Sequence, residues 1–166
     1  MHADAMVVCK LLDEASLSAL AGFPAKFFGA GDPVARVPTA DRAFVNANGA
    51  ALRIGFCGYW ETGTKPEASR DVTIELTQGD PAKPGTWSAD AAHQQYGVYM
   101  TNTAAPPTTI SGLGDEAFSV TNNGTTTVTV RSGDLIVRVE GDAPPGTTAI
   151  STDVLQNISK AVLGKV

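Results

Sequence analysis

The sequence predicts an α+β domain: a single antiparallel twisted sheet of about five or more strands, with helices packed mainly on one face. Two observations predict this fold. Apolar and polar residues alternate with the period of two that is typical of strands in five segments, and they recur at helical spacing in three others. These segments follow the order helix, two strands, helix, three strands, helix. Strands that follow one another across turns favour antiparallel pairing, with the helices inserted between them.

The chain has the length and composition of one domain. It contains 166 residues, of which 43% are hydrophobic, and this is enough to bury a single core. We expect residues 1–166 to form one domain, in which residues 1–8 are a disordered lead-in.

Charge and hydropathy exclude two classes of partner. The net charge is −5 and lysines and arginines form no cluster, whereas nucleic acids and anionic membranes bind basic patches. No stretch approaches the ~20 apolar residues of a membrane span. We therefore expect no nucleic-acid partner, and membrane attachment only through an N-terminal anchor outside this sequence. A leader for export is expected to lie upstream as well.

The first helix is expected between Leu11 and Pro24. Asp13 suits the N-cap, Gly22 can take the left-handed conformation at the end, and Pro24 prevents continuation. Residues 24–50 contain too many glycines and prolines for a long regular element, so we expect them to be irregular.

Residues 51–61 and 72–77 alternate with a period of two and predict an antiparallel hairpin. In the first strand, one face carries Leu52, Ile54, Phe56 and Trp60, and the other carries Arg53, Cys57 and Tyr59.

A second helix is expected to begin after Ser88, which suits its N-cap. Residues 117–141 predict a three-stranded meander with turns at "NNG" and "SGD" and with one solvated face. A last helix follows, capped by Ser151 or Thr152. The apolar stripes of the two helices are Ala92, Tyr96, Tyr99 and Met100, and Val154, Leu155, Ile158 and Val162.

The most suggestive site for chemistry is "GLGDE", which ends in Asp115 and Glu116. A hydrolase can use two carboxylates, so one of these acids is a candidate if it meets another carboxylate or His93. Neighbouring residues on an extended chain point to opposite sides, and we therefore expect the two acids not to serve one substrate together. We interpret them as turn acids and predict no catalytic residue.

The glycines of the same loop have a structural interpretation. Gly112 and Gly114 are expected to adopt unusual backbone angles or to allow close packing, while Leu113 is buried. The loop lacks the lysine, the third glycine and the following helix of a nucleotide-binding loop. His93 follows Asp90 by three residues and is interpreted as part of a solvated helix face.

No motif predicts a metal or a cofactor. The sequence has no histidine pair, no C-x-x-C and no D-x-D-x-D-G loop. We expect neither a metal site nor a cofactor.

Four aromatic residues are the candidate ligand-binding residues: Trp60, Trp87, Tyr96 and Tyr99. They could line an apolar cleft between the sheet and a helix, or they could belong to the core. The threonine-rich face of the meander is expected to be solvated rather than a binding platform. Its residues are Thr127, Thr129, Arg131 and Arg138.

The two cysteines, Cys9 and Cys57, are either free buried thiols or one disulfide. If paired, they close a loop of about 49 residues, which contributes about 4 kcal/mol to stability in the chain-entropy estimate. An exported protein favours the bridge and a reducing cytosol does not.

Four motifs in order resemble a domain of unknown function that is common in actinobacterial secreted lipoproteins. They are "CKLLDEASLSALAG" from Cys9, "CGYW" from Cys57, "ISGLGDEAF" from Ile110 and "VRSGDLIVRV" from Val130, and an amphipathic helix follows them. The family is related to PsbP-like and mycobacterial lipoprotein folds and to kinase sensor domains. This chain departs from the pattern in its Gly/Pro-containing insertion before "CGYW" and in having no lipobox.

The resemblance implies export, a Cys9–Cys57 disulfide and an α+β sandwich, and it brings no catalytic residues. We therefore expect a non-enzymatic domain, exported to the cell envelope or secreted, that binds a small apolar ligand or a cell-envelope protein. One alternative is a sensor or interaction module of a larger membrane-anchored protein. The other is a hydrolase that uses Asp115 or Glu116.

Overall fold

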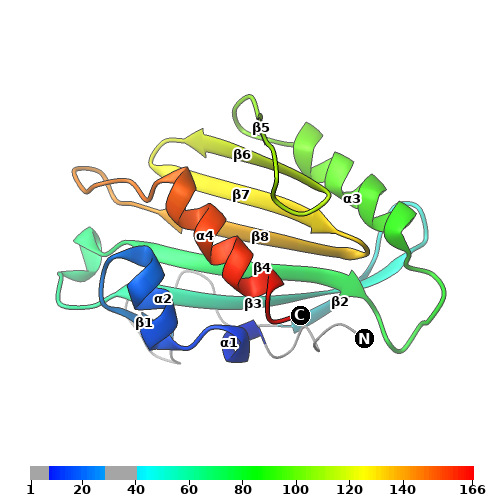
Figure 1. The fold of residues 1–166 in the computed structure, drawn as a ribbon, viewed down its shortest axis with the longest axis horizontal. Coiled ribbons are helices and arrows are strands. Elements are labelled where there is room, and N and C mark those ends of the chain that lie inside the picture. The colour runs from blue at the N-terminus through cyan, green and yellow to red at the C-terminus, as the bar shows by residue number, and fades with distance from the viewer. Residues whose placement is uncertain (1–7, 29–40) are drawn as a thin grey trace.

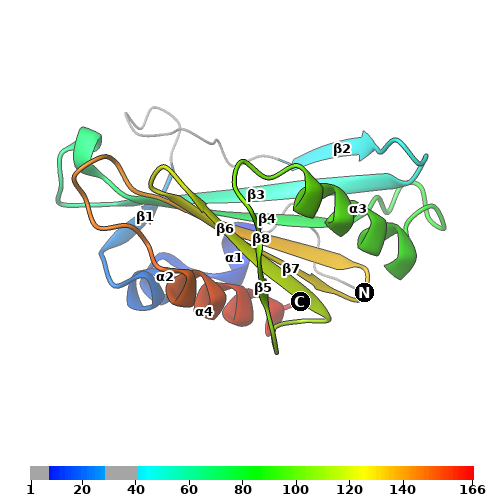
Figure 2. The ribbon, with the colours of Figure 1, turned by 90° about the horizontal axis from the view of Figure 1, so that it is seen from above.

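A computed structural model of the chain describes residues 8–28 and 41–166. In these residues an eight-stranded antiparallel sheet separates helices on its two faces (Figures 1 and 2), which confirms the predicted α+β fold. The helices are α1 Val8–Leu11, α2 Glu14–Ala21, α3 Ala89–Thr101 and α4 Thr152–Leu163. The strands are β1 Ala25–Phe27, β2 Asp41–Val45, β3 Ala51–Glu61, β4 Asp71–Gly79, β5 Thr108–Ile110, β6 Glu116–Asn122, β7 Thr125–Ser132 and β8 Leu135–Asp142.

The strands follow the order β1-β3-β4-β8-β7-β6-β5, and β2 pairs with β3 beside β1. The predicted β3–β4 hairpin and the β6–β7–β8 meander form its centre, joined by the antiparallel pairing of β4 with β8. The hairpin and the meander are therefore joined by a single strand pair, β4 with β8, whose members lie far apart in the sequence.

Part of the segment 24–50 differs from the prediction of irregular structure. β1 and β2 both lie in it and pair with successive parts of β3, at Tyr59–Glu61 and Ala51–Gly55. Their pairing is set by β3 rather than by a local pattern, and strands of three and five residues leave little periodicity to detect. The remainder of the glycine- and proline-rich stretch, 29–40, lies outside the described residues.

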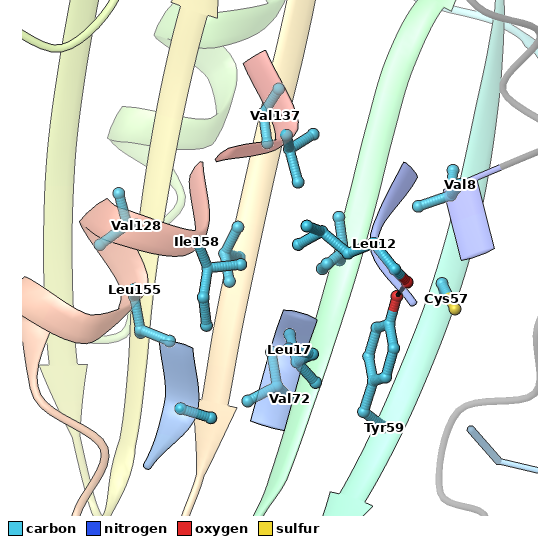
Figure 3. Packing of buried hydrophobic residues seen from close by; sticks show 14 of the residues in the cluster. Val8, Leu12, Leu17, Cys57, Tyr59, Val72, Val128, Val137, Leu155 and Ile158 are labelled. Carbon is cyan, nitrogen blue, oxygen red and sulfur yellow. Dashed lines mark hydrogen bonds between the residues drawn. The ribbon is translucent and has the colours of Figure 1, made fainter. Parts of the chain in front are cut away.

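The main core lies on the face that α1, α2 and α4 cover (Figures 2 and 3). Leu155, Ile158 and Val162 of α4 and Leu17 of α2 are fully buried there against the central strands. The helices α1, α2 and α4 therefore share one face and α3 lies on the other, which agrees with the prediction of helices mainly on one face.

The disulfide Cys9–Cys57 is present and joins α1 to β3, with the two Cα atoms 5.2 Å apart. Next to it, the buried Tyr59 hydroxyl donates a hydrogen bond of 2.6 Å to the Leu12 carbonyl (Figure 3). Val8, expected in the disordered lead-in, begins α1 and is 1% exposed. The N-terminal segment is thus held to the sheet by a covalent bond, a hydrogen bond and apolar packing.

The helix ends follow the predicted caps. The Asp13 carboxylate accepts a hydrogen bond of 2.7 Å from the Ser16 amide, and Gly22 ends α2 with φ of 76°. Ser88 caps α3 and Ser151 caps α4. The sequence left Ser151 and Thr152 as alternatives for the last cap, and Ser151 holds that position.

Candidate ligand-binding cavity

The opposite face of the sheet carries α3, which lies over β7 and β8 (Figure 2). Ala92 and Tyr96 of α3 pack on Phe118 and Ile136, and the Tyr96 and Phe118 rings meet edge to face with centroids 5.3 Å apart. This second, smaller core fixes the helix on the sheet. The meander face predicted to be solvated is therefore partly covered, because α3 packs on it.

Trp87 anchors the start of α3. Its indole N–H donates to the Asp134 carbonyl over 2.6 Å. The absent side chain of Gly79 makes room for the ring, since a Cβ there would lie 2.9 Å from the Trp87 Cβ. The start of α3 can thus lie close to β4 only because residue 79 is glycine.

A cavity of about 650 Å³ opens beside the second half of α3. Its floor is formed by β6, β7 and β8, and its wall by the end of α3 and the segment after it. The lining residues are Val98, Tyr99, Asn102, Thr103, Ala104, Phe118, Val120, Asn122, Asn123, Thr125, Thr127, Thr129, Arg138 and Glu140.

The floor changes character from strand to strand. β6 contributes the apolar Phe118 and Val120, and β8 contributes the charged Arg138 and Glu140. Between them lies what we term the threonine column: Thr125, Thr127 and Thr129 of β7. The cavity thus combines an apolar patch at Phe118 and Val120 with polar groups on β7, on β8 and at the end of β6, where Asn122 lies.

The threonine column is hydrogen-bonded to β8 at two of its three members. The Thr125 hydroxyl donates to Asp142 over 2.7 Å, and the Thr127 hydroxyl donates to Glu140 over 3.2 Å. The Thr129 hydroxyl, in a residue 1% exposed, makes no hydrogen bond within the described part of the chain. A buried hydroxyl without a partner is uncommon and costs stability.

The register explains this difference. Thr125 and Thr127 lie opposite acids, whereas Thr129 lies opposite Arg138. A guanidinium has donors only, so it cannot accept the Thr129 proton.

Arg138 is held by β4 and α3. Its Nη1 donates to Glu75 over 3.1 Å, and its guanidinium carbon lies 5.1 Å from the centre of the Tyr99 ring. The Tyr99 hydroxyl donates to the same Glu75 over 3.1 Å and lies 3.3 Å from the Thr77 hydroxyl. Burial, followed by the nearby Glu75 charge, raises the pKa of Tyr99 to about 12.

The four aromatic residues named from the sequence do not all meet. Tyr99 lines the cavity, and Trp87 and Tyr96 pack in the second core beside it. Trp60 lies on β3, where it pairs with Asp71 and Lys26, and it is not among the lining residues.

Three lining residues belong to the face that the sequence predicts to be solvated: Thr127, Thr129 and Arg138. The alternation of threonine and valine in β7 did mark a polar face correctly. The sequence did not show that α3 covers this face, because the alternation within a strand does not indicate which face a distant helix packs against.

The loop "GLGDE" forms an ion-pair cluster. The Arg131 guanidinium contacts Glu116 through Nε over 2.7 Å and Asp115 through Nη1 over 3.1 Å, and His93 Nδ1 lies 2.9 Å from Glu116. The expectation that the two acids point apart was wrong. Asp115 precedes the strand, and Gly114, with φ of 62°, turns the chain so that both acids reach one guanidinium.

The same contacts show what the cluster does. Asp115 also accepts from the Gly133 amide over 2.7 Å, so it holds the β7–β8 turn. The side chains of His93 and Asp115 are 61% and 53% exposed, and none of these residues lines the cavity. The contact of Glu116 with His93 that the hydrolase alternative requires is therefore present, but it lies on the exposed surface and not in the cavity. The pKa of Glu116 is held below its usual range, first by the Arg131 hydrogen bond.

The loop glycines have the predicted roles. Gly112 and Gly114 have positive φ, and Leu113 is 4% exposed. Among the described residues, no three acids, histidines or cysteines lie together as a metal site would require. None of the helices in this part of the chain has the length and hydropathy of a membrane span.

Comparison with solved structures shows a likeness in fold. The fold is similar to the crystal structure of the extracellular domain of PknH from Mycobacterium tuberculosis, with 14% sequence identity, a TM-score of 0.47, and coverage of 99% of this chain and 98% of that chain. No protein-family model and no curated protein matches the sequence. At this identity and TM-score, no residue role, ligand or activity transfers to this chain.

Proposed function

We propose that this chain is a non-enzymatic, extracytoplasmic domain that binds a small, largely apolar ligand in the cavity beside α3. The cavity of about 650 Å³ is the observation that carries the proposal. Ligand sites commonly measure about 300–1,000 Å³ and combine apolar walls with a few polar groups. The volume meets that description, and Val98, Phe118 and Val120 supply an apolar wall, while most of the other lining residues are polar.

The disulfide supports the location. Bridges such as Cys9–Cys57 persist in oxidising compartments and are rare in the cytosol. Free secretion and attachment to the cell envelope are both compatible with this bridge. In a larger membrane-anchored protein, the same cavity would act as the sensing site.

The ion-pair cluster supports a non-enzymatic role. Glu116, one of the two acids named for the hydrolase alternative, already binds Arg131 and His93, and the other, Asp115, binds the same arginine. A general acid needs a raised pKa to donate its proton near neutral pH, whereas the pKa of Glu116 is lowered. The cluster therefore resembles a structural ion pair more than an acid catalyst.

Titration with N-phenyl-1-naphthylamine, a neutral dye that fluoresces in apolar sites, tests the proposal. The wild-type protein is expected to bind the dye saturably. Val120→Trp fills the cavity from the floor and Val98→Trp from the wall, and each should weaken binding at least about tenfold.

The matched control is Val45→Trp, which adds the same ring at a position that is 58% exposed on β2 and outside the lining. Thermal unfolding of each variant checks its fold. Equal dye binding by wild type and by folded Val120→Trp and Val98→Trp would overturn the proposal.

A further inference from the structure

We infer that the cavity selects neutral amphipathic ligands, in which an acceptor oxygen such as an amide or ester carbonyl adjoins an apolar chain, over the corresponding carboxylic acids. The inference rests on the proposed function and specifies the ligand class of the same cavity. The inference is based on the Thr129 hydroxyl, which has no hydrogen-bond partner in the described chain, on the Arg138 guanidinium, and on the carboxylates of Glu75 and Glu140.

The Thr129 hydroxyl indicates where a ligand oxygen would bind. Thr129 is the buried member of the threonine column whose hydroxyl has no partner in the described chain. Its two column neighbours donate to acids on β8, but the residue opposite Thr129 is Arg138. A ligand oxygen would supply the hydrogen-bond acceptor that Thr129 lacks, because Arg138, the residue opposite it, has donors only.

The guanidinium provides further donors at the same place. Nη1 of Arg138 donates to Glu75, whereas Nη2 lies 3.9 Å from Glu140, which is beyond hydrogen-bond distance. An arginine has five N–H groups, so donors remain for a ligand. The ligand oxygen would lie beside Thr129 and Arg138, which are opposite each other on β7 and β8 and both line the cavity. The buried Thr129 hydroxyl reaches that oxygen only if the neighbouring side chains move.

The charge balance decides between a neutral and an anionic oxygen. Two carboxylates, Glu75 and Glu140, approach the single Arg138 guanidinium, so the group carries one excess negative charge. A carboxylate ligand would be attracted by Arg138 but repelled by both acids, while a neutral carbonyl meets no such repulsion. The raised pKa of Tyr99 agrees, because burial and Glu75 also oppose a negative charge on that ring.

The apolar part of the ligand has a defined place. Phe118 and Val120 line the side of the floor beyond the threonine column, and Val98 of α3 faces the same cavity while 48% exposed. A chain that lies along β6 would cover these side chains and leave its polar end beside Arg138.

Calorimetric titration at pH 7 with octanamide and octanoate tests the selection. The two probes share chain length and differ in charge. Octanamide is expected to bind at least about tenfold more tightly than octanoate. Equal or tighter binding of octanoate, or no binding of octanamide, would overturn the inference.

Matched variants locate the acceptor. Thr129→Val should weaken octanamide binding about tenfold and raise the melting temperature by about 3 °C, since it removes an unpaired buried hydroxyl. Thr129→Ser keeps the hydroxyl and should retain binding. Thr127→Val removes a hydroxyl already bonded to Glu140 and should weaken binding less than about threefold. Equal losses for Thr129→Val and Thr127→Val would contradict the assignment.

The cavity as the binding site and its selectivity for neutral ligands can be disproved separately. If the neutral dye is displaced by the tryptophan variants but octanoate binds more tightly than octanamide, the cavity binds ligands and its selectivity is misassigned. If the tryptophan variants leave the dye in place, the cavity itself is not the site.

Discussion

Arg131 on β7 lies directly opposite Glu116 on β6, and its Nε–H donates to the Glu116 carboxylate over 2.7 Å. The same guanidinium reaches Asp115, which in turn holds the turn at Gly133. Arg131 thus connects the start of β6 to the β7–β8 hairpin. The acids of the "GLGDE" loop, which the sequence offers as candidates for catalysis, therefore stabilise the sheet.

This pair predicts a loss of stability in acid. The pKa of Glu116 is lowered in the folded protein, so its contribution is present above the unfolded value of about 4.3 and is lost as pH falls through the folded value. Glu116→Gln should therefore show a smaller fall in unfolding free energy between pH 6 and pH 3, measured by urea denaturation. Glu67→Gln, at an exposed position in the turn Pro66–Ala68, should keep the wild-type fall. Parallel curves for wild type and Glu116→Gln would contradict the prediction.

Gly114 should tolerate no side chain. An added Cβ would lie 2.5 Å from the Arg131 carbonyl oxygen and 2.6 Å from a Val130 methyl group, at a φ of 62°. Gly114→Ala is therefore expected to lower the unfolding free energy by about 3 kcal/mol or more.

Gly112 is the matched control for that substitution. Its φ of 75° is similar, but an added Cβ would meet nothing within 4 Å. Gly112→Ala should cost about 1 kcal/mol, because only the backbone conformation is strained. Equal losses at the two glycines, measured by urea denaturation, would show that the close approach to β7 is not the cause.

The Cys9–Cys57 bridge should contribute strongly to stability. It spans a sequence separation of 48 residues, and removing it by the double change Cys9→Ala and Cys57→Ala should lower the unfolding free energy by about 4 kcal/mol. Intact mass should rise by two hydrogens on reduction of the wild-type protein and stay unchanged in the variant. An unchanged wild-type mass would contradict the bridge.

Tyr59→Phe should destabilise the N-terminal segment. It removes the 2.6 Å hydrogen bond to Leu12 and leaves that carbonyl without its donor, which costs about 1–2 kcal/mol. Tyr96→Phe is the control, since the Tyr96 hydroxyl makes no hydrogen bond within the described chain. It should change the unfolding free energy by less than about 0.5 kcal/mol. A similar loss in both variants would mean that the ring environment rather than the hydrogen bond is responsible.

The sequence predicted the elements whose signals are local. Asp13, Gly22 and Ser88 mark helix ends by the chemistry of their own side chains or backbone, and the structure places all three at caps. The meander likewise follows from alternation over full-length strands. Its strands and turns lie where the pattern predicted them.

The elements and the site that the sequence missed depend on distant contacts. β1 and β2 are strands because β3 offers them hydrogen-bonding edges. Thr129 and Arg138 line a cavity because α3, separated from them along the chain by two and three strands, covers that face. An alternating pattern distinguishes the two faces of a strand, but it does not show what will lie above either one.

Chemical-shift mapping with octanamide locates the ligand site on the protein. In ¹H–¹⁵N spectra of the wild-type protein, the largest shifts are expected on the threonine column and on Val98–Asn102 at the end of α3. Thr129→Val should reduce them at equal ligand concentration. Shifts gathered around Trp60 on β3, with the threonine column unchanged, would contradict the claim that the cavity beside α3 is the ligand site.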